Sequence, residues 1–308
     1  MGSRTLGHSG IEVSELGLGC NNFGRRVDLE GTRAVVEEAL ANGVTFLDTA
    51  DIYGGQGGSE ELLGQVLEGR RDQVVLATKF GMDMHDGATA RGSADYIARA
   101  VEASLRRLRT DVIDVYWYHE PDGVTPIAET LGALDRLVRE GKVRAIGASN
   151  FSAEQIEEAD SVARENGLTR FTAVQNEYSL LVREAEAEVL PTCDRLGLGF
   201  VPYFPLASGL LTGKYRRGQA APAGTRLSGR EQVASDEQFE LVEKLTGYAE
   251  ARGLELTDVA IGTLLARPEV SSVIAGATKP EQVRGNARAL GWRPSEQDLS
   301  ELYELLDG

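Results

Sequence analysis

The sequence predicts a (β/α)8 barrel formed by residues 1–308 as one domain, with eight parallel strands closed into a ring inside a layer of helices. Two observations predict it. Short runs of β-branched and aliphatic residues alternate with amphipathic helical stretches along the whole chain, without a linker-like break. Apolar strands joined by helical crossovers pair in parallel, and eight such units favour a closed barrel over an open sheet.

The first expected element is a hairpin, in which residues 4–6 and 11–13 flank the turn 7–10. The eight barrel strands are expected near residues 15–19, 45–49, 74–79, 112–119, 145–149, 173–176, 199–203 and 273–275. These runs are short, apolar and bounded by turn or helix signals, as buried strands are.

Three helices carry particular signals. Residues 93–107 place Ile97, Val101, Leu105 and Leu108 on one stripe. Residues 152–165 begin with Ser152 and have Gln155 three positions later, which is the spacing of a capping box. Residues 296–306 read as a closing helix, and no tail follows that would roof a pocket.

Residues 205–235 are too long for an ordinary connection. They contain five glycines and five basic residues: Gly209, Gly213, Gly218, Gly224 and Gly229 with Lys214, Arg216, Arg217, Arg226 and Arg230. A basic, glycine-rich loop in an acidic protein suggests a mobile clamp over an anionic ligand. The alternative is a solvated insertion with scattered charge.

Composition excludes several classes of protein. The chain has 48 acidic and 32 basic residues, a formal charge of −16 that would repel nucleic acid and anionic membranes. No apolar run approaches the roughly 20 residues needed to cross a bilayer. With only Cys20 and Cys193 and no signal peptide, no disulfide framework is expected, which favours a reduced, cytoplasmic setting.

Four polar residues lie where predicted strands end: Asp48, Tyr53, Lys79 and His119. Strand ends carry the chemistry of α/β proteins. Taken singly, each has an ordinary structural interpretation: a helix N-cap for Asp48, a loop aromatic for Tyr53, a solvated strand end for Lys79 and a buried histidine for His119. His8 and His85 lie in loops, and we interpret both as ordinary structural residues.

Six segments in this order resemble the aldo-keto reductase family over essentially the whole chain. They are residues 46–54 (FLDTADIYG), 78–79 (TK), 111–122 (DVIDVYWYHEPD), 147–151 (GASNF), 174–178 (VQNEY) and 205–214 (PLASGLLTGK). The resemblance implies a (β/α)8 barrel, a nicotinamide dinucleotide bound across its C-terminal face, and reversible hydride transfer to a carbonyl. It resembles most the branch of bacterial enzymes similar to potassium-channel β subunits.

The resemblance makes Asp48, Tyr53, Lys79 and His119 the catalytic residues, and chemistry shows why the set is coherent. A hydride that reaches a carbonyl carbon leaves negative charge on oxygen, so a proton donor is needed there. Tyr53 is the expected general acid, and the Lys79 ammonium should lower its pKa from about 10. Asp48 would keep Lys79 charged, and His119 would orient the carbonyl oxygen. Channel β subunits generally lack this histidine, so His119 favours turnover.

The resemblance also assigns the cofactor site, expected to bind NADP(H). Its residues are Gly19, Cys20, Asn21, Asp48, Ser149, Asn150, Gln175, Tyr203, Phe204, Pro205, Leu206, Gly209, Lys214, Arg226, Gly276, Thr278, Gln282 and Asn286. Ser149, Asn150 and Gln175 would bind the carboxamide, and Tyr203 would stack on the nicotinamide. The helix after Lys279 would offer its N-terminal amides to phosphate. Gln282 replaces the arginine that grips the 2′-phosphate in many members, so the expected NADPH preference rests on Thr278, Lys279, Lys214 and Arg226.

Two glycine-rich segments do not carry other nucleotide motifs. Residues 17–24 (GLGCNNFG) have the third glycine displaced from the dinucleotide-binding spacing, and Asp48 lies too far downstream. Residues 54–58 (GGQGG) lack the lysine and hydroxyl residue of a phosphate-binding loop. No metal site is expected.

Substrate residues are expected at the mouth of the barrel: Asn22, Phe23, Tyr53, Phe80 and His119, with Tyr178 as a further candidate. Trp117 should fill the barrel interior. The expected partner is a small carbonyl compound, such as an aldehyde, a keto-sugar or a bulkier ketone, in a pocket open at one side. The alternative function is a cofactor-bound, redox-sensing regulatory subunit with little turnover. The sequence does not fix the oligomeric state.

Overall fold

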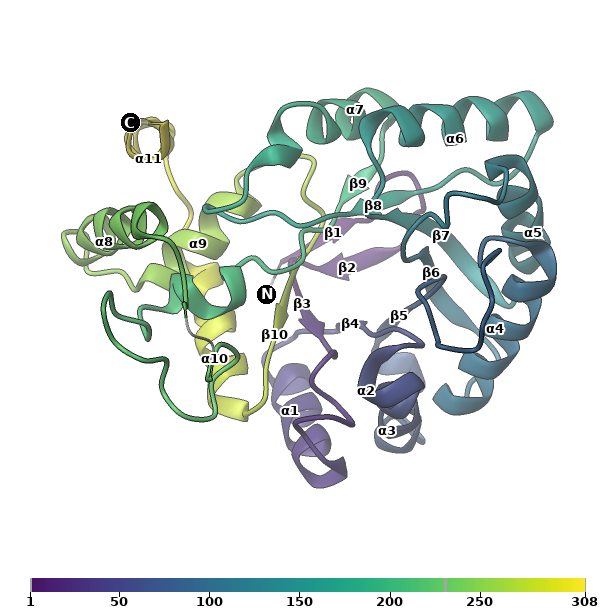
Figure 1. Ribbon diagram of the computed structural model, residues 1–308, viewed down its shortest axis with the longest axis horizontal. Coiled ribbons are helices and arrows are strands. Elements are labelled where there is room, and N and C mark those ends of the chain that lie inside the picture. The colour runs from purple at the N-terminus through teal and green to yellow at the C-terminus, as the bar shows by residue number, and fades with distance from the viewer. Residues whose placement is uncertain (1, 230–231, 308) are drawn as a thin grey trace.

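The computed structural model describes residues 2–229 and 232–307, so Arg230 of the predicted basic loop lies outside the described residues. Its centre is a parallel sheet in the order β10-β3-β4-β5-β6-β7-β8-β9 (Figure 1). The strands are β3 (Leu16–Gly19), β4 (Phe46–Asp48), β5 (Val75–Phe80), β6 (Ile113–Tyr118), β7 (Val143–Ser149), β8 (Ala173–Gln175), β9 (Gly199–Phe200) and β10 (Val273–Gly276). All eight predicted strands are confirmed.

The sheet closes into a barrel because its two edge strands meet. The N–H of Ser271 donates to the carbonyl of Phe200 (2.9 Å), and the N–H of Ile274 donates to the carbonyl of Pro202 (3.0 Å). Isolated bridges join Phe200 to Val270 and Tyr203 to Ile274. The predicted strand 199–203 is therefore a short β9 followed by single bridges, and these complete the (β/α)8 ring.

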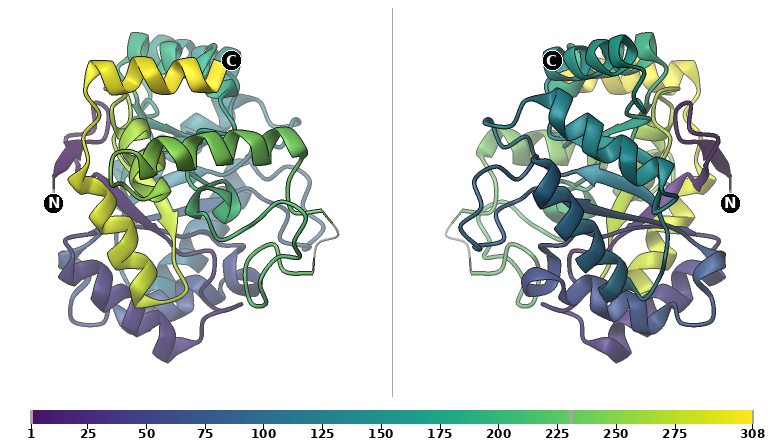
Figure 2. Two further views of the ribbon diagram at one scale, coloured as in Figure 1. Left: turned by 90° about the vertical axis from the view of Figure 1, so that its left-hand side faces the viewer. Right: turned by 90° about the vertical axis from the view of Figure 1, so that its right-hand side faces the viewer.

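Helices cover the outside of the barrel (Figures 1 and 2). They are α1 (Leu29–Ala41), α2 (Tyr53–Gln56), α3 (Gly58–Val66), α4 (Ala94–Leu108), α5 (Ile127–Arg139), α6 (Ala153–Asn166), α7 (Val189–Leu196), α8 (Asp236–Glu250), α9 (Leu256–Leu265), α10 (Pro280–Arg288) and α11 (Glu296–Asp307). The predicted stripe of α4 is buried, and α6 has the predicted capping box between Ser152 and Gln155. Among the described residues, no helix is long and apolar enough to span a bilayer.

Side chains that point into the barrel alternate along each strand with side chains that point to the helices. Phe46, Val115 and Trp117 belong to the interior cluster, and Trp117 is fully buried as predicted. The predicted hairpin, β1 (Ser3–Thr5) with β2 (Glu12–Ser14), adds Leu6, Ile11 and Val13 to the same cluster. It closes the N-terminal end of the barrel, opposite the loop that follows β9 (Figure 2).

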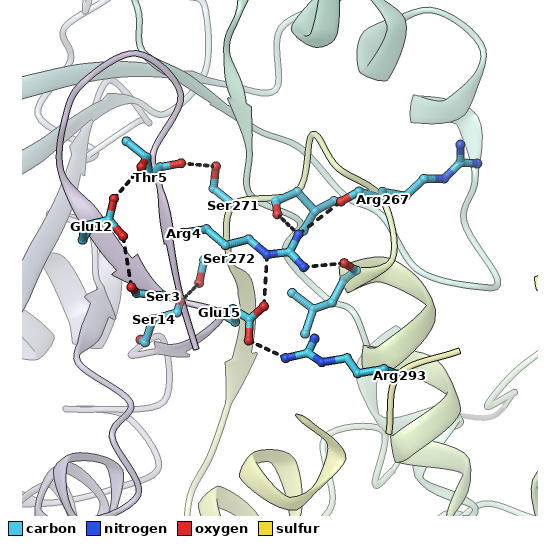
Figure 3. Close-up of polar contacts among 12 residues, drawn as sticks. Ser3, Arg4, Thr5, Glu12, Ser14, Glu15, Arg267, Ser271, Ser272 and Arg293 are labelled. Atoms are coloured by element: carbon cyan, nitrogen blue, oxygen red, sulfur yellow. Dashed lines mark hydrogen bonds and ion pairs between the residues drawn. The ribbon is translucent and has the colours of Figure 1, made fainter. Parts of the chain in front are cut away.

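Arg4 fastens this hairpin to the rest of the protein (Figure 3). Its guanidinium donates to the carbonyl of Leu265 at the end of α9 (2.7 Å), to the carbonyl of Val270 beyond it (2.8 Å), and to Oε1 of Glu15 (3.1 Å). Arg293 binds the other carboxylate oxygen of Glu15. Hydrogen bonds to charged groups are the stronger ones, so this contact ties the first strand to the last third of the chain.

The segment after β9 is packed rather than loose where it begins. The 3-10 helix η3 (Ala207–Thr212) opens it, and Leu211, Tyr215 and Leu227 are buried against α8 and α9 in a second apolar cluster. The N–H of Leu227 donates to the hydroxyl of Tyr215 (3.4 Å). Its basic side chains Lys214 and Arg226 remain exposed. Because Leu211, Tyr215 and Leu227 are buried, the alternative of a wholly solvated insertion does not describe this segment.

Candidate active site

The C-terminal ends of the strands bring the predicted polar residues into one layer. Asp48 follows the inward Phe46 by two positions, and Lys79 follows the inward Ala77 in the same way. Register pairs Lys79 with Trp117, two residues before His119, and pairs Ser149 with Gln175. Because side chains alternate in direction, all of these residues point into the mouth of the barrel.

Asp48 and Lys79 form a buried ion pair. Nζ of Lys79 donates to Oδ2 of Asp48 and to the carbonyl of Thr49 (3.0 Å). Nε2 of Gln175 donates to Oδ1 of Asp48 (3.1 Å). Lys79 is 1% exposed and Asp48 is 3% exposed. Such a pair is stable only when both groups have further hydrogen bonds, and these contacts supply them.

Tyr53 and His119 face each other above this pair. Their ring centroids are 5.8 Å apart at an interplanar angle of 86°, and Nζ of Lys79 lies 5.4 Å from the Tyr53 centroid. Burial, followed by the Asp48 carboxylate, raises the pKa of Tyr53 above its usual 10. The net lowering of this pKa that was expected from Lys79 is therefore wrong, because burial and the Asp48 carboxylate dominate.

His119 is neutral in this setting. Burial, and then the Lys79 ammonium, hold the pKa of His119 well below 6.5. The backbone fixes its position, since its N–H donates to the carbonyl of Phe80 (2.8 Å) and its carbonyl accepts from Nδ2 of Asn150 (2.9 Å). Nδ1 has no hydrogen-bond partner among residues 2–229 and 232–307. A neutral imidazole offers one N–H donor to a ligand.

The residues assigned to the carboxamide lie beside His119. Asn150 has a left-handed backbone (φ 59°), and its Oδ1 accepts from the hydroxyl of Tyr203 (2.8 Å). Nδ2 of Asn150 also contacts Oγ of Ser149 (3.3 Å). The structure thus brings Ser149, Asn150, Gln175 and Tyr203 together.

The loop after β9 reaches this end of the barrel. Phe204 has a positive φ of 53°, and the guanidinium of Arg226 lies 4.4 Å from the centre of its ring. Arg226 also opposes the rise in the pKa of Tyr53, which places its charge near the phenol. Arg26 donates to the carbonyl of Gly224 (2.5 Å), so the segment before α1 supports the loop. No sequence signal pointed to Arg26.

On the side of the mouth formed by β3 and β10, two glycines leave the backbone without covering side chains. Gly19 and Gly276 are paired neighbours on β3 and β10, and a Cβ on Gly19 would lie 3.6 Å from the Cα of Gly276. Asn21 and Asn22 adjoin Gly276, and Oδ1 of Asn21 is buried without a partner in the described part of the chain. Glycine allows a ligand to approach the backbone closely, so this surface fits an elongated polar group.

Beyond Gly276 the chain enters α10. Lys279 is its N-cap residue, and Oε1 of Gln282 accepts from the N–H (2.7 Å) and hydroxyl (3.1 Å) of Thr278. Asn286 is buried one turn later. A helix N-terminus beside a lysine suits phosphate. At the other end of the predicted cleft, Lys214 lies against Gly209, and Pro205 and Leu206 lead into η3.

Two predicted substrate residues do not line the mouth. Phe23 and Phe80 are fully buried in the outer core. Phe80 follows the inward Lys79 and therefore points outward, where its ring stacks on Tyr118 at 5.0 Å. Tyr178 is also buried and donates to Glu186 (2.7 Å). Cys20 is fully buried as well, and burial raises the pKa of its thiol. Of the other predicted residues, Tyr53 and His119 face each other at the mouth, and Asn22 adjoins Gly276.

Sequence reasoning missed a group of charged residues behind Tyr53. Asp51, Glu60 and Arg107 come together there, with both carboxyl groups buried. The signal was present in part, since Asp51 and Glu60 flank a glycine-rich turn in an otherwise apolar region. Arg107 could not be linked to them from sequence, because it lies on the far end of α4.

Comparison with known proteins agrees with this arrangement. A sequence model of the aldo/keto reductase family matches residues 15–307. The chain is 38% identical to an uncharacterized oxidoreductase of Bacillus subtilis, over 98% of this chain and 95% of that protein. It is 34% identical to "probable aldo-keto reductase 1" of Glycine max (98% and 88%), and 37% identical to a "probable voltage-gated potassium channel subunit beta" of Oryza sativa (93% and 90%). The chain is an oxidoreductase that belongs to the aldo/keto reductase family.

Proposed function

We propose that this enzyme reduces an aldehyde or ketone to the alcohol, in a reversible hydride transfer, with NADPH as the donor and Tyr53 as the general acid. The observation that carries the proposal is the position of Tyr53. Its ring faces His119 at the open end of the barrel, directly above the buried Asp48–Lys79 pair. The bound nicotinamide supplies the hydride.

Tyr53 gives its proton to the carbonyl oxygen. Because burial and Asp48 raise its pKa, the phenol remains protonated until negative charge builds up on that oxygen. Proton transfer then leaves charge on the phenolate oxygen, and the nearby ammonium of Lys79 stabilises it. Neutral His119 donates a hydrogen bond to the same oxygen and fixes its position. Asp48 keeps Lys79 charged in this dry setting.

The cofactor would lie extended from Tyr203 across Gly19 and Gly276 to α10. Ser149, Asn150 and Gln175 offer amide and hydroxyl groups for the carboxamide, and the backbone of Cys20 and Asn21 adjoins the same end. Phe204, Pro205, Leu206, Gly209, Lys214 and Arg226 would cover the pyrophosphate, with Thr278, Gln282 and Asn286 at the adenosine. The bare glycines and the orphaned Oδ1 of Asn21 support this path.

Preference for NADPH over NADH follows from the cations along that path. Lys279 at the start of α10, next to the residues expected at the adenosine, offers positive charge for the 2′-phosphate, and exposed Lys214 and Arg226 add positive charge along the phosphates. We expect kcat/KM to be at least about tenfold higher with NADPH, and Lys279→Met to lower that ratio, since a phosphate contact contributes about 1–2 kcal/mol. Equal kcat/KM for the two cofactors would contradict this preference.

The direct test is NADPH oxidation with a panel of aldehydes, ketones and keto-sugars. Tyr53→Phe removes the acidic proton without removing the ring, so it should lower kcat by about a hundredfold or more while the Kd for NADPH stays within about twofold. Tyr248→Phe is the matched control, because its hydroxyl binds Asp298 on the outer helices (2.9 Å). A fully active Tyr53→Phe variant would refute the assignment.

A second candidate is a regulatory subunit that holds the cofactor and turns over little. The likeness to the rice channel β subunit favours it. It predicts tight, slowly exchanging cofactor and no turnover on the whole panel. The same assay therefore separates the two functions, with cofactor exchange measured by nicotinamide fluorescence.

A further inference from the structure

A cluster of buried charged groups lies behind the turn that carries Tyr53. Glu60, at the start of α3, is fully buried, and Asp51 is 2% exposed. Oε2 of Glu60 accepts from Nε of Arg107 on α4 (2.6 Å), and its Oε1 accepts from Oγ1 of Thr78 on β5 (2.5 Å). Asp51 makes no ion pair within the described ranges, and its Oδ1 has no hydrogen-bond partner there.

This cluster holds more acidic groups than Arg107 can neutralise. If Asp51 and Glu60 were both ionised, the single guanidinium of Arg107 would leave an uncompensated negative charge in a buried region. Burial, and then the charge of Glu60, raise the pKa of Asp51 to about 8, while Arg107 and Lys79 oppose the rise. The other titratable groups near Asp51 are the phenols of Tyr96 on α4, Tyr116 on β6 and Tyr53 itself. Asp51 is therefore protonated at neutral pH.

The same residues enclose the Tyr53 turn from both sides. At its start, the N–H of Asp51 donates to the carbonyl of Lys79 (3.1 Å). At its end, a Cβ added to Gly57 would lie 2.5 Å from Cδ of Arg107, so the arginine side chain rests directly on the turn. Gly57 has a φ of 113°, a conformation that fits only glycine well. Tyr53 lies between these two anchoring points.

We propose that Asp51, Glu60 and Arg107 are positioning residues for Tyr53, which hold its turn in place through one proton carried by Asp51. Loss of that proton to solvent creates a second buried negative charge against Glu60. The turn then moves to hydrate it, and Tyr53 moves away from His119. The inference rests on the proposed role of Tyr53, and it adds a group that controls the reaction without touching substrate or cofactor.

The test is the pH dependence of kcat and KM, measured with saturating NADPH and an aldehyde that the wild-type enzyme reduces. We expect wild-type kcat to fall above pH 8 with little change in KM. Asp51→Asn cannot ionise, so its kcat should show no fall in this range, and its rate relative to wild type should rise about tenfold one pH unit above that midpoint. Glu60→Gln removes the neighbouring negative charge and leaves Arg107 to balance an ionised Asp51, so the alkaline fall of kcat should be weaker than in wild type. Asp194→Asn, an exposed aspartate on α7, is the control.

A second measurement does not depend on turnover. Stability to urea, compared between wild type and Asp51→Asn from about pH 5 to about pH 9, should diverge as pH rises toward 8 and then differ by a constant amount. An unchanged alkaline fall of kcat in Asp51→Asn would overturn the inference and leave the reductase intact. If no carbonyl compound is reduced, the proposed function fails by itself. In that case, parallel stability curves of wild type and Asp51→Asn would overturn the inference that Asp51 carries a proton, and diverging curves would support it.

Discussion

The buried Asp48–Lys79 pair allows one prediction to be worked out in detail. Lys79→Met keeps the length and the apolar stem of the side chain but removes the charge, so packing changes little. Asp48, 3% exposed, is left with a single hydrogen bond from Gln175. Removal of one partner from a buried ion pair costs about 3–5 kcal/mol, because the remaining charge is uncompensated. We expect a loss of that size in the free energy of unfolding.

Urea denaturation at pH 7, followed by circular dichroism, measures this loss. Lys244→Met is the control, since Lys244 pairs with Glu240 on the exposed face of α8 and such surface pairs contribute less than about 1 kcal/mol. The double variant Asp48→Asn/Lys79→Met should be more stable than Lys79→Met alone by about 1–3 kcal/mol, because the orphaned charge is gone. Additive losses in the double variant, or a single loss no larger than that of Lys244→Met, would refute the reasoning.

Three further predictions concern stability and the Tyr53 turn. The folded-state pKa of Asp51, raised to about 8 from 3.8, means that the unfolded chain releases this proton first, so wild-type stability falls as pH rises between these values. Because the loss is about 1.4 kcal/mol per pH unit, the free energy of unfolding of Asp51→Asn should exceed that of wild type by at most about 6 kcal/mol above pH 8. Urea denaturation at several pH values measures this difference. Arg4→Met should lower the free energy of unfolding by about 2–4 kcal/mol, because it removes several charge-assisted hydrogen bonds of the hairpin. A lower Tm in thermal denaturation would show this loss. Gly57→Ala should lower kcat about tenfold or more, because the added methyl group would push the Tyr53 turn away from Arg107. Gly69 also has a positive φ but no neighbouring atoms around an added Cβ, so Gly69→Ala should affect stability alone. Equal kcat in both variants would contradict this prediction.

The barrel was predictable from sequence because its strands carry strong local signals. Short apolar runs that alternate with helical stretches located all eight strands, and the inward position of Trp117 followed from its two-residue spacing to His119. The same alternation contradicts the placement of Phe80 at the mouth, since its neighbour Lys79 must point inward. Near the end of a strand only every second side chain faces the mouth, so proximity to the strand end does not place a residue there.

The loop and the charged cluster could not be predicted in the same way. Arg226 lies on the ring of Phe204, which has a positive φ, and no residue pattern predicts either feature. The pairing of Glu60 with Arg107 joins α3 to the end of α4, and only the packing of those helices brings the two residues together. The pKa of Tyr53 likewise depends on burial and on nearby charges, which the order of residues does not reveal.

The hairpin that closes the N-terminal end of the barrel affects where molecules can enter and leave the enzyme. Because Leu6, Ile11 and Val13 join the interior cluster beneath Phe46 and Trp117, no tunnel runs through the ring. Reactants and products would then enter and leave at the opposite, C-terminal end. A dinucleotide bound across that end, as proposed above, would narrow the opening for anything that arrives later, so the coenzyme would bind first and leave last.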